Sequence, residues 1–351
     1  MQDWLRHGTA VIFFLVLLVS VPGGSRVALA ADHAVVLTYG RFGNDPNPTA
    51  AIRIEQFEAQ LRVLKTEGYE VLALDEIVRR LKAGEELPDR TVAITVDDGH
   101  ASFATQAWPR LKAAGLPVTL FVATATVDSG TGLTWTDLRR MKAEGLAVGN
   151  ITHTYPYLPL QGRERIASEI ATASDRIEAE LGARPRLFAY PYGIWSAAAR
   201  AQVAEAGFDA AFGQQSGVAY GRADRYTLPR FPMNEATGSP SRFRLTIDAL
   251  PLAVTDIVPL DPMVTANPPE IGFTLLDPLE QPDRLACFAS HLSSPAALEW
   301  LGHDHVEIRL AQPFPPGRGR INCTAPGPDG RWRWLGLPIL VPTPSAGQTL
   351  Q

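Results

Sequence analysis

The feature that most constrains the fold of this chain is an alternation of short apolar runs with amphipathic stretches from Ala34 to Phe243. Short apolar runs predict buried strands and the amphipathic stretches predict helices, a pattern typical of repeated strand–helix units. Strands are expected at 35–39, 91–96, 117–123, 146–149, 186–190 and 208–212, and helices at 54–66, 74–83, 102–114, 135–143, 163–181 and 195–206. We therefore predict an α/β fold in which parallel strands form a distorted (β/α) barrel, with helices outside and fewer than eight units.

The character of the chain changes after Leu245. Residues 245–351 contain 16 of the 29 prolines and no lysine. Helical periodicity gives way to short strand-like runs between Pro and Gly turns, at 271–275, 284–289, 305–310, 318–323 and 331–335. We predict that a barrel domain at 31–245 is followed by a smaller β-rich, sandwich-like domain at 246–343 and a tail at 344–351.

Two features of the C-terminal region predict specific contacts. Cys287 and Cys323 both fall in expected strands, which favours a disulfide between them over two buried free thiols. Trp332 and Trp334 alternate with arginines along another expected strand. We expect these tryptophans to pack the C-terminal domain onto the barrel.

The N-terminal residues resemble an export signal. An apolar run from Val11 to Val21 follows a short head carrying Arg6, and Ala28-Leu29-Ala30 matches the small-residue pattern of a cleavage site. The run is about half the length that crosses a bilayer. We predict a signal peptide at 1–30 and an exported mature chain, periplasmic or extracellular, with no stable membrane span after processing. An unprocessed membrane anchor is the alternative.

Charge and motifs exclude several classes of function. The chain has 32 Lys+Arg against 37 Asp+Glu, a net charge of −5, and no basic run, so it lacks the positive surface that a nucleic-acid partner requires. The sequence contains no GxSxG nucleophile elbow, no HExxH zinc helix, no P-loop and no GxGxxG after a strand.

The most informative segment for chemistry is 91–100, where an apolar strand ends in Asp97, Asp98 and Gly99. Barrel folds place catalytic groups at the C-terminal ends of their strands. Adjacent carboxylates that leave a strand point in different directions, so one can bind a metal while the other acts as general base on the metal's water. The alternative is that Asp98 caps the following helix, or that both carboxylates lie in a solvated turn.

Three segments in order resemble the polysaccharide deacetylase family, the NodB homology domain of carbohydrate esterase family 4. Thr95-Val96-Asp97-Asp98-Gly99 is similar to the family's TFDDG motif, and the second and third motifs correspond to 146–156 and to Phe188-Ala189-Tyr190-Pro191-Tyr192-Gly193. The opening strand at 36–43 and Leu228-Pro229-Arg230-Phe231 also look like this family. The resemblance covers residues 34–243 and implies a barrel of the NodB type.

The resemblance implies hydrolysis of the acetamide bonds of N-acetylated, or less often O-acetylated, polysaccharide or oligosaccharide. It assigns Asp97 as general base and Asp98 as a ligand of a divalent metal, zinc or similar. It also implies that the backbone N–H of Tyr192 holds the oxyanion and that Tyr190, Pro191 and Tyr192 bind substrate. The scheme is coherent, because an amide carbonyl needs an activated water, a base and donors at the developing charge.

The second motif departs from the family pattern. The family has two metal-binding histidines at i and i+4, and aligning the motif places Ile151 and Tyr155 there. Isoleucine cannot bind a metal, and a phenol is a poor ligand. His153 or His100 could complete a rearranged site with Asp98, although each histidine could equally be an ordinary loop residue.

Three functions therefore stay open. The first is a metal-dependent deacetylase. The second is a metal-free pseudoenzyme that binds acetylated glycan, or a partner protein, without hydrolysis. In the third, the β-rich domain is the functional part and the barrel is a scaffold.

Overall fold

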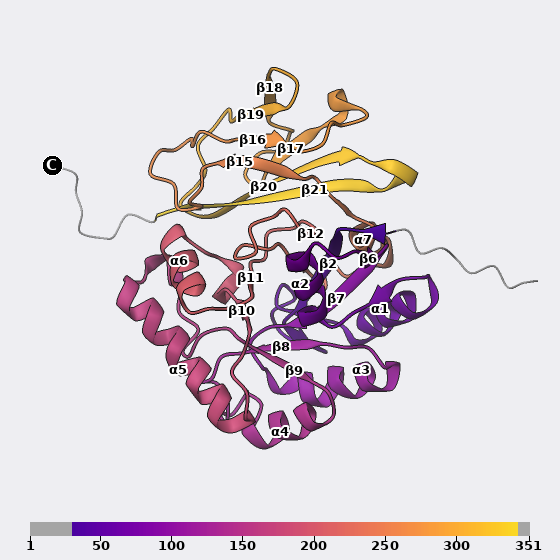
Figure 1. Cartoon of the computed structure of the whole chain (residues 1–351), viewed down its shortest axis with the longest axis vertical. Coiled ribbons are helices and arrows are strands. Elements are labelled where there is room, and N and C mark those ends of the chain that lie inside the picture. Colours follow the sequence, from indigo (N-terminus) through magenta and orange to yellow (C-terminus); the bar gives the residue numbers. More distant parts are fainter. Residues whose placement is uncertain (1–29, 343–351) are drawn as a thin grey trace, which may run out of the picture.

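The computed structural model describes residues 30–342. A barrel with helices around it forms one end of the molecule, and a β-rich part forms the other, with β20 and β21 lying across the boundary (Figure 1). The predicted signal peptide lies outside the described residues except for Ala30, and the predicted tail at 344–351 also lies outside them.

The predicted barrel strands form in the order expected for strand–helix units. Their central sheet has the order β11-β10-β9-β8-β7-β2-β12, and its pairs from β11 to β2 are all parallel. The bounds are β2 His33–Tyr39, β5 Glu70–Val71, β7 Thr91–Val96, β8 Thr119–Val122, β9 Ala147–Asn150, β10 Leu187–Ala189, β11 Ala210–Phe212 and β12 Ala219–Tyr220. Short strands lie outside this path: β1 Ala30–Ala31 pairs with β6 Leu87–Pro88, and β3 Arg41–Phe42 pairs with β4 Ala51–Ile52.

One segment, residues 228–232, closes the barrel between its first and last parallel strands. Leu228 forms a bridge with Phe212 in β11, and β13 (Phe231–Pro232) pairs in parallel with β2. The side chain of Arg230, between these two contacts, is fully buried. The fold is therefore the distorted (β/α) barrel of fewer than eight units that the sequence predicted.

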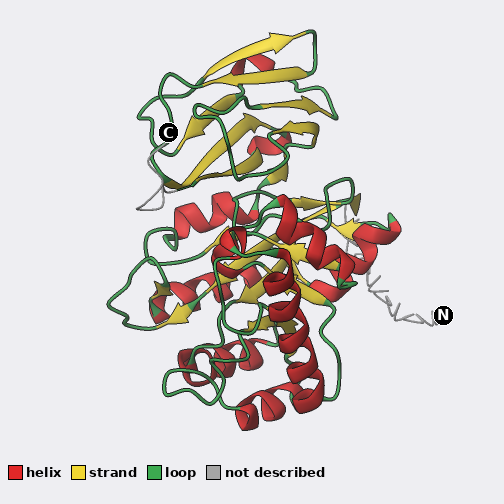
Figure 2. Cartoon of the chain, turned by 90° about the vertical axis from the view of Figure 1, so that its left-hand side faces the viewer, coloured by secondary structure: helices red, strands yellow, loops and turns green. Residues whose placement is uncertain are grey.

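Helices cover the outside of the barrel (Figure 2), and four of them have the predicted bounds. They are α1 Ile54–Thr66, α2 Leu74–Ala83, α3 Trp108–Ala114, α4 Trp135–Ala143, α5 Arg163–Leu181, α6 Ala197–Glu205 and α7 Pro240–Ile247. The expected helix at 102–114 is divided into a π-helical turn (Phe103–Ala107) and α3. No helix within residues 30–342 is long and apolar enough to cross a membrane.

The sequence did not predict α7. Ser239 caps it by accepting a hydrogen bond from the Arg242 N–H, and Pro240 occupies its first turn. Phe243 and Ile247, on either side of the expected domain limit at residue 245, both pack in the barrel core. That limit stays a prediction.

The C-terminal region is a sandwich of two four-stranded sheets, with orders β14-β21-β20-β17 and β15-β16-β19-β18. The bounds are β14 Leu250–Pro251, β15 Val254–Val258, β16 Gly272–Leu275, β17 Ala286–Ala289, β18 Ala297–Leu301, β19 His305–Arg309, β20 Gly317–Pro326 and β21 Trp332–Val341. Side chains from both sheets share one apolar cluster. Cys287 in β17 and Cys323 in β20 form the predicted disulfide within this core.

The barrel and the sandwich are in direct contact along β21. Trp334 packs edge-on against Phe231 at 5.3 Å, which confirms its predicted role. Arg331, expected on the opposite face of the strand, also binds the barrel, at Asp89 Oδ1 and the Asp248 carbonyl. A Cβ at Gly336 would lie 2.3 Å from the Ser216 carbonyl oxygen, so this close approach of the two backbones requires glycine.

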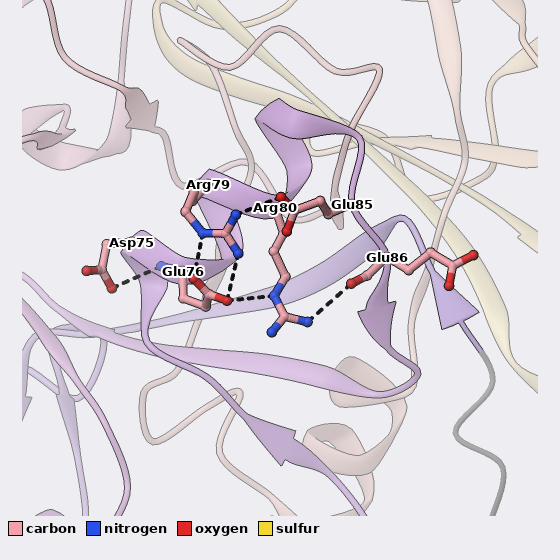
Figure 3. Close-up of polar contacts among 6 residues, drawn as sticks. All are labelled: Asp75, Glu76, Arg79, Arg80, Glu85 and Glu86. Atoms are coloured by element: carbon pink, nitrogen blue, oxygen red, sulfur yellow. Dashed lines mark hydrogen bonds and ion pairs between the residues drawn. The ribbon is translucent and has the colours of Figure 1, made fainter.

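A cluster of ion pairs fixes the connection between α2 and β6 at the surface (Figure 3). Arg79 donates hydrogen bonds to Glu76 and Glu85, and Arg80 donates to Glu76 and to the Glu86 carbonyl. The two arginines lower the pKa of Glu76 to about 2. Exposed pairs of this kind contribute little to stability, and we assign the cluster no functional role.

Candidate functional site

The C-terminal end of β7 holds Asp97 in a fixed network. Asp97 is buried, and its two carboxylate oxygens accept hydrogen bonds from Arg230 Nη1 and Nη2 at 2.7 and 2.9 Å. Gln214 Nε2 adds a third donor at 3.0 Å. A bidentate pair of this kind holds the carboxylate in one position and orientation.

Arg230 reaches Asp97 because the closing segment of the barrel directs its side chain inward. Its Nε donates to the Gly213 carbonyl, its Nη1 also donates to Thr95 Oγ1, and its guanidinium lies over the Phe121 ring. Sequence reasoning quoted Arg230 only within a family-like segment and assigned it no role. A single charge in an otherwise apolar segment was the signal that could have identified it.

Asp98 lies in a very different environment. Its backbone has φ 79°, and among the described residues its buried Oδ1 has no hydrogen-bond partner. Burial, and then the neighbouring charge of Asp97, raise the pKa of Asp98 from 3.8 to about 6. The alternative role as helix cap is not observed, because the Ser102 N–H donates to His100 Nδ1.

The second motif follows β9 in a tightly held loop. Asn150 Oδ1 accepts from the Thr152 N–H, and the buried carboxylate of Glu169 accepts from the N–H groups of His153 and Thr154. Ile151, at the first expected histidine position, is fully buried in an apolar cluster. Its environment is therefore that of a core residue.

Tyr155, at the second expected histidine position, extends toward the third motif. Its hydroxyl oxygen accepts a hydrogen bond from the Tyr192 N–H at 3.2 Å, and the two rings pack edge to face at 4.7 Å. Burial, with the charges of Asp98 and Asp97, raises the pKa of Tyr155 well above its usual range, so the phenol keeps its proton. The N–H predicted to hold an oxyanion is thus occupied by a side chain of the same protein.

The β-rich domain also reaches this site. Arg318 in β20 donates from Nη2 to the Tyr192 carbonyl at 2.8 Å. Tyr192 is 42% exposed and has φ 57°, and the Tyr157 ring lies 5.9 Å from its own. Hydrogen bonds at both its N–H, to Tyr155, and its carbonyl, from Arg318, therefore hold the Tyr192 backbone in place.

The two candidate histidine ligands do not join Asp98. His153 Nδ1 pairs with Thr124 Oγ1 at 2.8 Å, and His100 Nδ1 pairs with Ser102 Oγ at 2.8 Å. Across residues 30–342 no three His, Cys, Asp or Glu side chains are grouped so that they could hold a metal ion. The structure therefore does not bring Asp98, His100 and His153 together, because each histidine is held by its own local loop, and the rearranged site stays a prediction.

Two of the three predicted substrate-binding residues lie in the core. Tyr190 is fully buried and donates its hydroxyl to the Tyr226 carbonyl, and Pro191 is also buried. Neither side chain is exposed in this structure, and substrate binding by these two residues stays a prediction. Tyr192 alone of the three presents an exposed ring.

Comparisons with known proteins agree with this fold. Residues 84–211, which include Asp97, Asp98, the second motif and the third motif, match the family model described as polysaccharide deacetylase. The barrel is a member of the polysaccharide deacetylase family. This polysaccharide deacetylase domain is joined in the chain to the β-rich sandwich.

Individual relatives share moderate identity with this family member. A chitooligosaccharide deacetylase of Bradyrhizobium sp. is 35% identical over 133 residues, 37% of this chain and 59% of the relative. The poly-β-1,6-N-acetyl-D-glucosamine N-deacetylase of Escherichia coli is 24% identical over 213 residues, 48% of this chain and 32% of the relative. The structure of IcaB from Ammonifex degensii has a TM-score of 0.54 and 27% identity, covering 61% of this chain and 95% of that one.

The chain spans only part of its curated relatives. It covers 63% and 32% of the length of the first two of them. The activities in the relatives' names therefore belong to those proteins.

Proposed function

We propose that this member of the polysaccharide deacetylase family binds N-acetylated carbohydrate without hydrolysing it through a metal-activated water. The observation that carries the proposal is the position of Tyr155. Its protonated phenol stands where the family has a metal ligand, and it accepts the Tyr192 N–H that would otherwise hold an oxyanion.

The donor set at this site does not fit a divalent metal. Ile151 offers no ligand atom and lies in the apolar core, and the Tyr155 phenol keeps its proton. Asp98 remains as a single carboxylate, whereas a stable site needs several ligands in a fixed geometry. We therefore derive no reaction step through a metal.

Three tyrosine rings support carbohydrate binding. Tyr155 and Tyr157 both pack against Tyr192, a residue that is 42% exposed. Exposed aromatic rings offer flat apolar faces for the C–H groups of a sugar and hydroxyls for its polar edge. Arg318 holds the Tyr192 backbone, and the Tyr155 and Tyr157 rings pack against the Tyr192 ring.

Hydrolysis is the competing function, and the Asp97 network favours it. Asp97 remains at the end of β7 with Arg230 and Gln214 as donors, so a carboxylate stands in position for a general base. A base without an activated water or an available oxyanion donor lacks the two contributions that lower the barrier most in acyl transfer.

Acetate release separates the two functions. With N-acetylglucosamine oligomers and added zinc, cobalt or nickel, we expect the native protein to bind the oligomers and to release no acetate above the protein-free control. The double variant Ile151→His, Tyr155→His should gain bound zinc and chelator-sensitive acetate release. Chelator-sensitive release by the native protein would refute the proposal.

A matched control distinguishes a restored metal site from a general loosening of the loop. The variant Ile151→His, Tyr155→Phe also disturbs both positions but adds only one histidine. We expect it to bind zinc weakly and to release no acetate. Equal zinc binding by both double variants would show that a histidine in place of Tyr155 adds no metal ligand.

Export is a separate proposal. The apolar run at 11–21 and the Ala28-Leu29-Ala30 pattern support a signal peptide at 1–30 and a periplasmic or extracellular protein. N-terminal sequencing of protein from the exported fraction should begin near Ala31. Protein that retains Met1 would contradict cleavage.

A further inference from the structure

Strand β20 of the sandwich presents two exposed arginines on the face that meets the barrel. Ile321 and Cys323 belong to the sandwich core. Side chains alternate along a strand, so Arg318 and Arg320 project from the other face. The hydrogen bond from Arg318 Nη2 to the Tyr192 carbonyl shows that this face is turned toward the barrel, and β20 lies along the boundary between the two parts of the molecule (Figure 1). Arg320 follows about 7 Å further along the strand.

The two arginines have no counter-charge within the described part of the chain. Arg309 and Arg331, the arginines before and after them in the sequence, both form ion pairs, whereas neither Arg318 nor Arg320 forms one in residues 30–342. Burial lowers the pKa of Arg318, two neighbouring tyrosines raise it and Arg320 lowers it, and no carboxylate is among the charges that act on it. The guanidinium stays charged, because its pKa is far above neutral.

Acidic residues are absent from the whole sheet that carries these arginines. None of its strands, β14, β17, β20 and β21, contains an aspartate or a glutamate. The acidic residues of the sandwich strands are Asp256, Glu299 and Glu307, and all three lie in the other sheet. The chain as a whole is acidic, with a net charge of −5. The sheet that contacts the barrel is therefore a local basic surface on an acidic protein.

This basic surface is continuous with the tyrosine rings of the barrel. Tyr157 and Tyr155 both act on the pKa of Arg318, which places its guanidinium beside them. The bond to the Tyr192 carbonyl uses only one of the five N–H groups of Arg318. A partly dehydrated guanidinium with free N–H groups and no counter-ion is suited to bind a carboxylate, which it can hold through two parallel hydrogen bonds.

We propose that Arg318 and Arg320 bind carboxylate groups of the carbohydrate, so that the ligand of this protein is an acidic glycan. The inference rests on the proposed function, because it names the charge class of the carbohydrate that binds at the tyrosine rings. The barrel supplies aromatic faces for the sugar rings, and the sandwich supplies the positive charges. The sandwich thereby selects among carbohydrates, which the barrel alone does not do by charge.

Three hexasaccharides separate charge from the acetamido group in calorimetric titrations of the full chain. The hyaluronan hexasaccharide alternates N-acetylglucosamine with glucuronate, N-acetylchitohexaose is N-acetylated and neutral, and hexagalacturonate is acidic without acetamido groups. We expect the hyaluronan hexasaccharide to bind at least threefold more tightly than N-acetylchitohexaose at about 0.02 M salt, and this difference to vanish at about 0.5 M salt. Hexagalacturonate should bind more weakly than the hyaluronan hexasaccharide.

Arg320→Gln tests the arginines directly, because Arg320 does not hold the Tyr192 backbone as Arg318 does. We expect this variant to weaken binding of the hyaluronan hexasaccharide about threefold to fivefold and to leave binding of N-acetylchitohexaose unchanged. Arg284→Gln is the matched control. It removes the same charge from an exposed position of the sandwich before β17, at the opposite end of β20, and should change neither affinity.

The other outcomes overturn either this inference or the proposed function. Equal affinities of the native protein for the hyaluronan hexasaccharide and N-acetylchitohexaose refute the acidic ligand and leave the proposed function standing. Equal losses in Arg320→Gln and Arg284→Gln also refute it, because they indicate an effect of net charge alone. Equal affinities for the hyaluronan hexasaccharide and hexagalacturonate refute the proposed function and leave the arginine site standing. Absence of binding to all three refutes both.

Discussion

Two carboxylates that are adjacent in the chain, Asp97 and Asp98, have opposite environments. Asp97 accepts hydrogen bonds on both oxygens from Arg230 and a further one from Gln214. Asp98 lies beside it with a buried oxygen that no described residue satisfies and with a raised pKa. The partners of Asp97 come from the segments that close the barrel, whereas the side chain that interacts with Asp98 is Tyr155 of the second motif, which acts to lower the pKa of Asp98 against the larger effect of burial.

The barrel core requires the Asp97–Arg230 pair, but it does not require metal ligands at the positions of Ile151 and Tyr155. The Asp97–Arg230 pair is buried in the barrel, so losing either partner leaves an uncompensated charge in the core. The positions of Ile151 and Tyr155 carry no such penalty, because a core isoleucine and a protonated phenol are stable there. Replacement of the metal ligands therefore leaves the barrel intact.

Removing Arg230 should have the largest effect. We expect Arg230→Met to lower the free energy of unfolding by about 3–5 kcal/mol, because it leaves the Asp97 carboxylate buried and unpaired. Urea denaturation measures the loss. Arg176→Met, which removes the exposed pair with Glu180, is the control and should cost less than about 1 kcal/mol. Similar losses of unfolding free energy in Arg230→Met and Arg176→Met would show that the buried Asp97–Arg230 pair matters no more than an exposed pair.

Neutralising Asp98 should raise the free energy of unfolding, whereas removing Arg230 lowers it. The folded-state pKa of about 6 lies above the ordinary 3.8, so the folded protein loses stability as pH rises through this window. A shift of this size corresponds to about 2–3 kcal/mol above pH 6. We expect Asp98→Asn to be more stable than the native protein by about that amount at pH 7 and equal to it below pH 4. Denaturation from pH 3.5 to 7.5 tests this.

The matched control for Asp98 is its neighbour. Asp97→Asn should destabilise the protein at pH 7, because it leaves the Arg230 guanidinium without its counter-charge. The comparison between the two carboxylates fails if both asparagine variants change stability in the same direction.

Removing the Arg318 side chain should have the smallest effect. It donates one hydrogen bond to the Tyr192 carbonyl, so we expect Arg318→Ala to cost about 1 kcal/mol and to weaken carbohydrate binding at the tyrosine rings. Arg284→Ala, at an exposed position of the sandwich before β17, is the control and should change neither quantity measurably. If the two variants are indistinguishable in binding and stability, the sandwich does not organise this site.

Local sequence patterns predicted most of the fold. The bounds of β7 and of α1, α2, α4 and α5 agree with the prediction, because each depends on neighbouring residues and on one buried face. The short strands β14, β15 and β18 and the helix α7 were missed. Strands of a few residues between proline-rich turns carry little periodicity, and their pairing partners are distant in the sequence.

For the site, the sequence alone identified Asp97 and Asp98 at the end of a buried strand and showed that Ile151 and Tyr155 replace the family's histidines. Tertiary structure alone decided that Arg230 pairs with Asp97, that Tyr155 takes the Tyr192 N–H and that Tyr190 lies in the core. It also placed Arg318 of the sandwich beside Tyr192 of the barrel. Strand ends and ligand chemistry can be read from adjacent residues. The contacts listed above instead join segments that are tens to hundreds of residues apart in the chain. Only barrel closure and the docking of the sandwich bring these segments together.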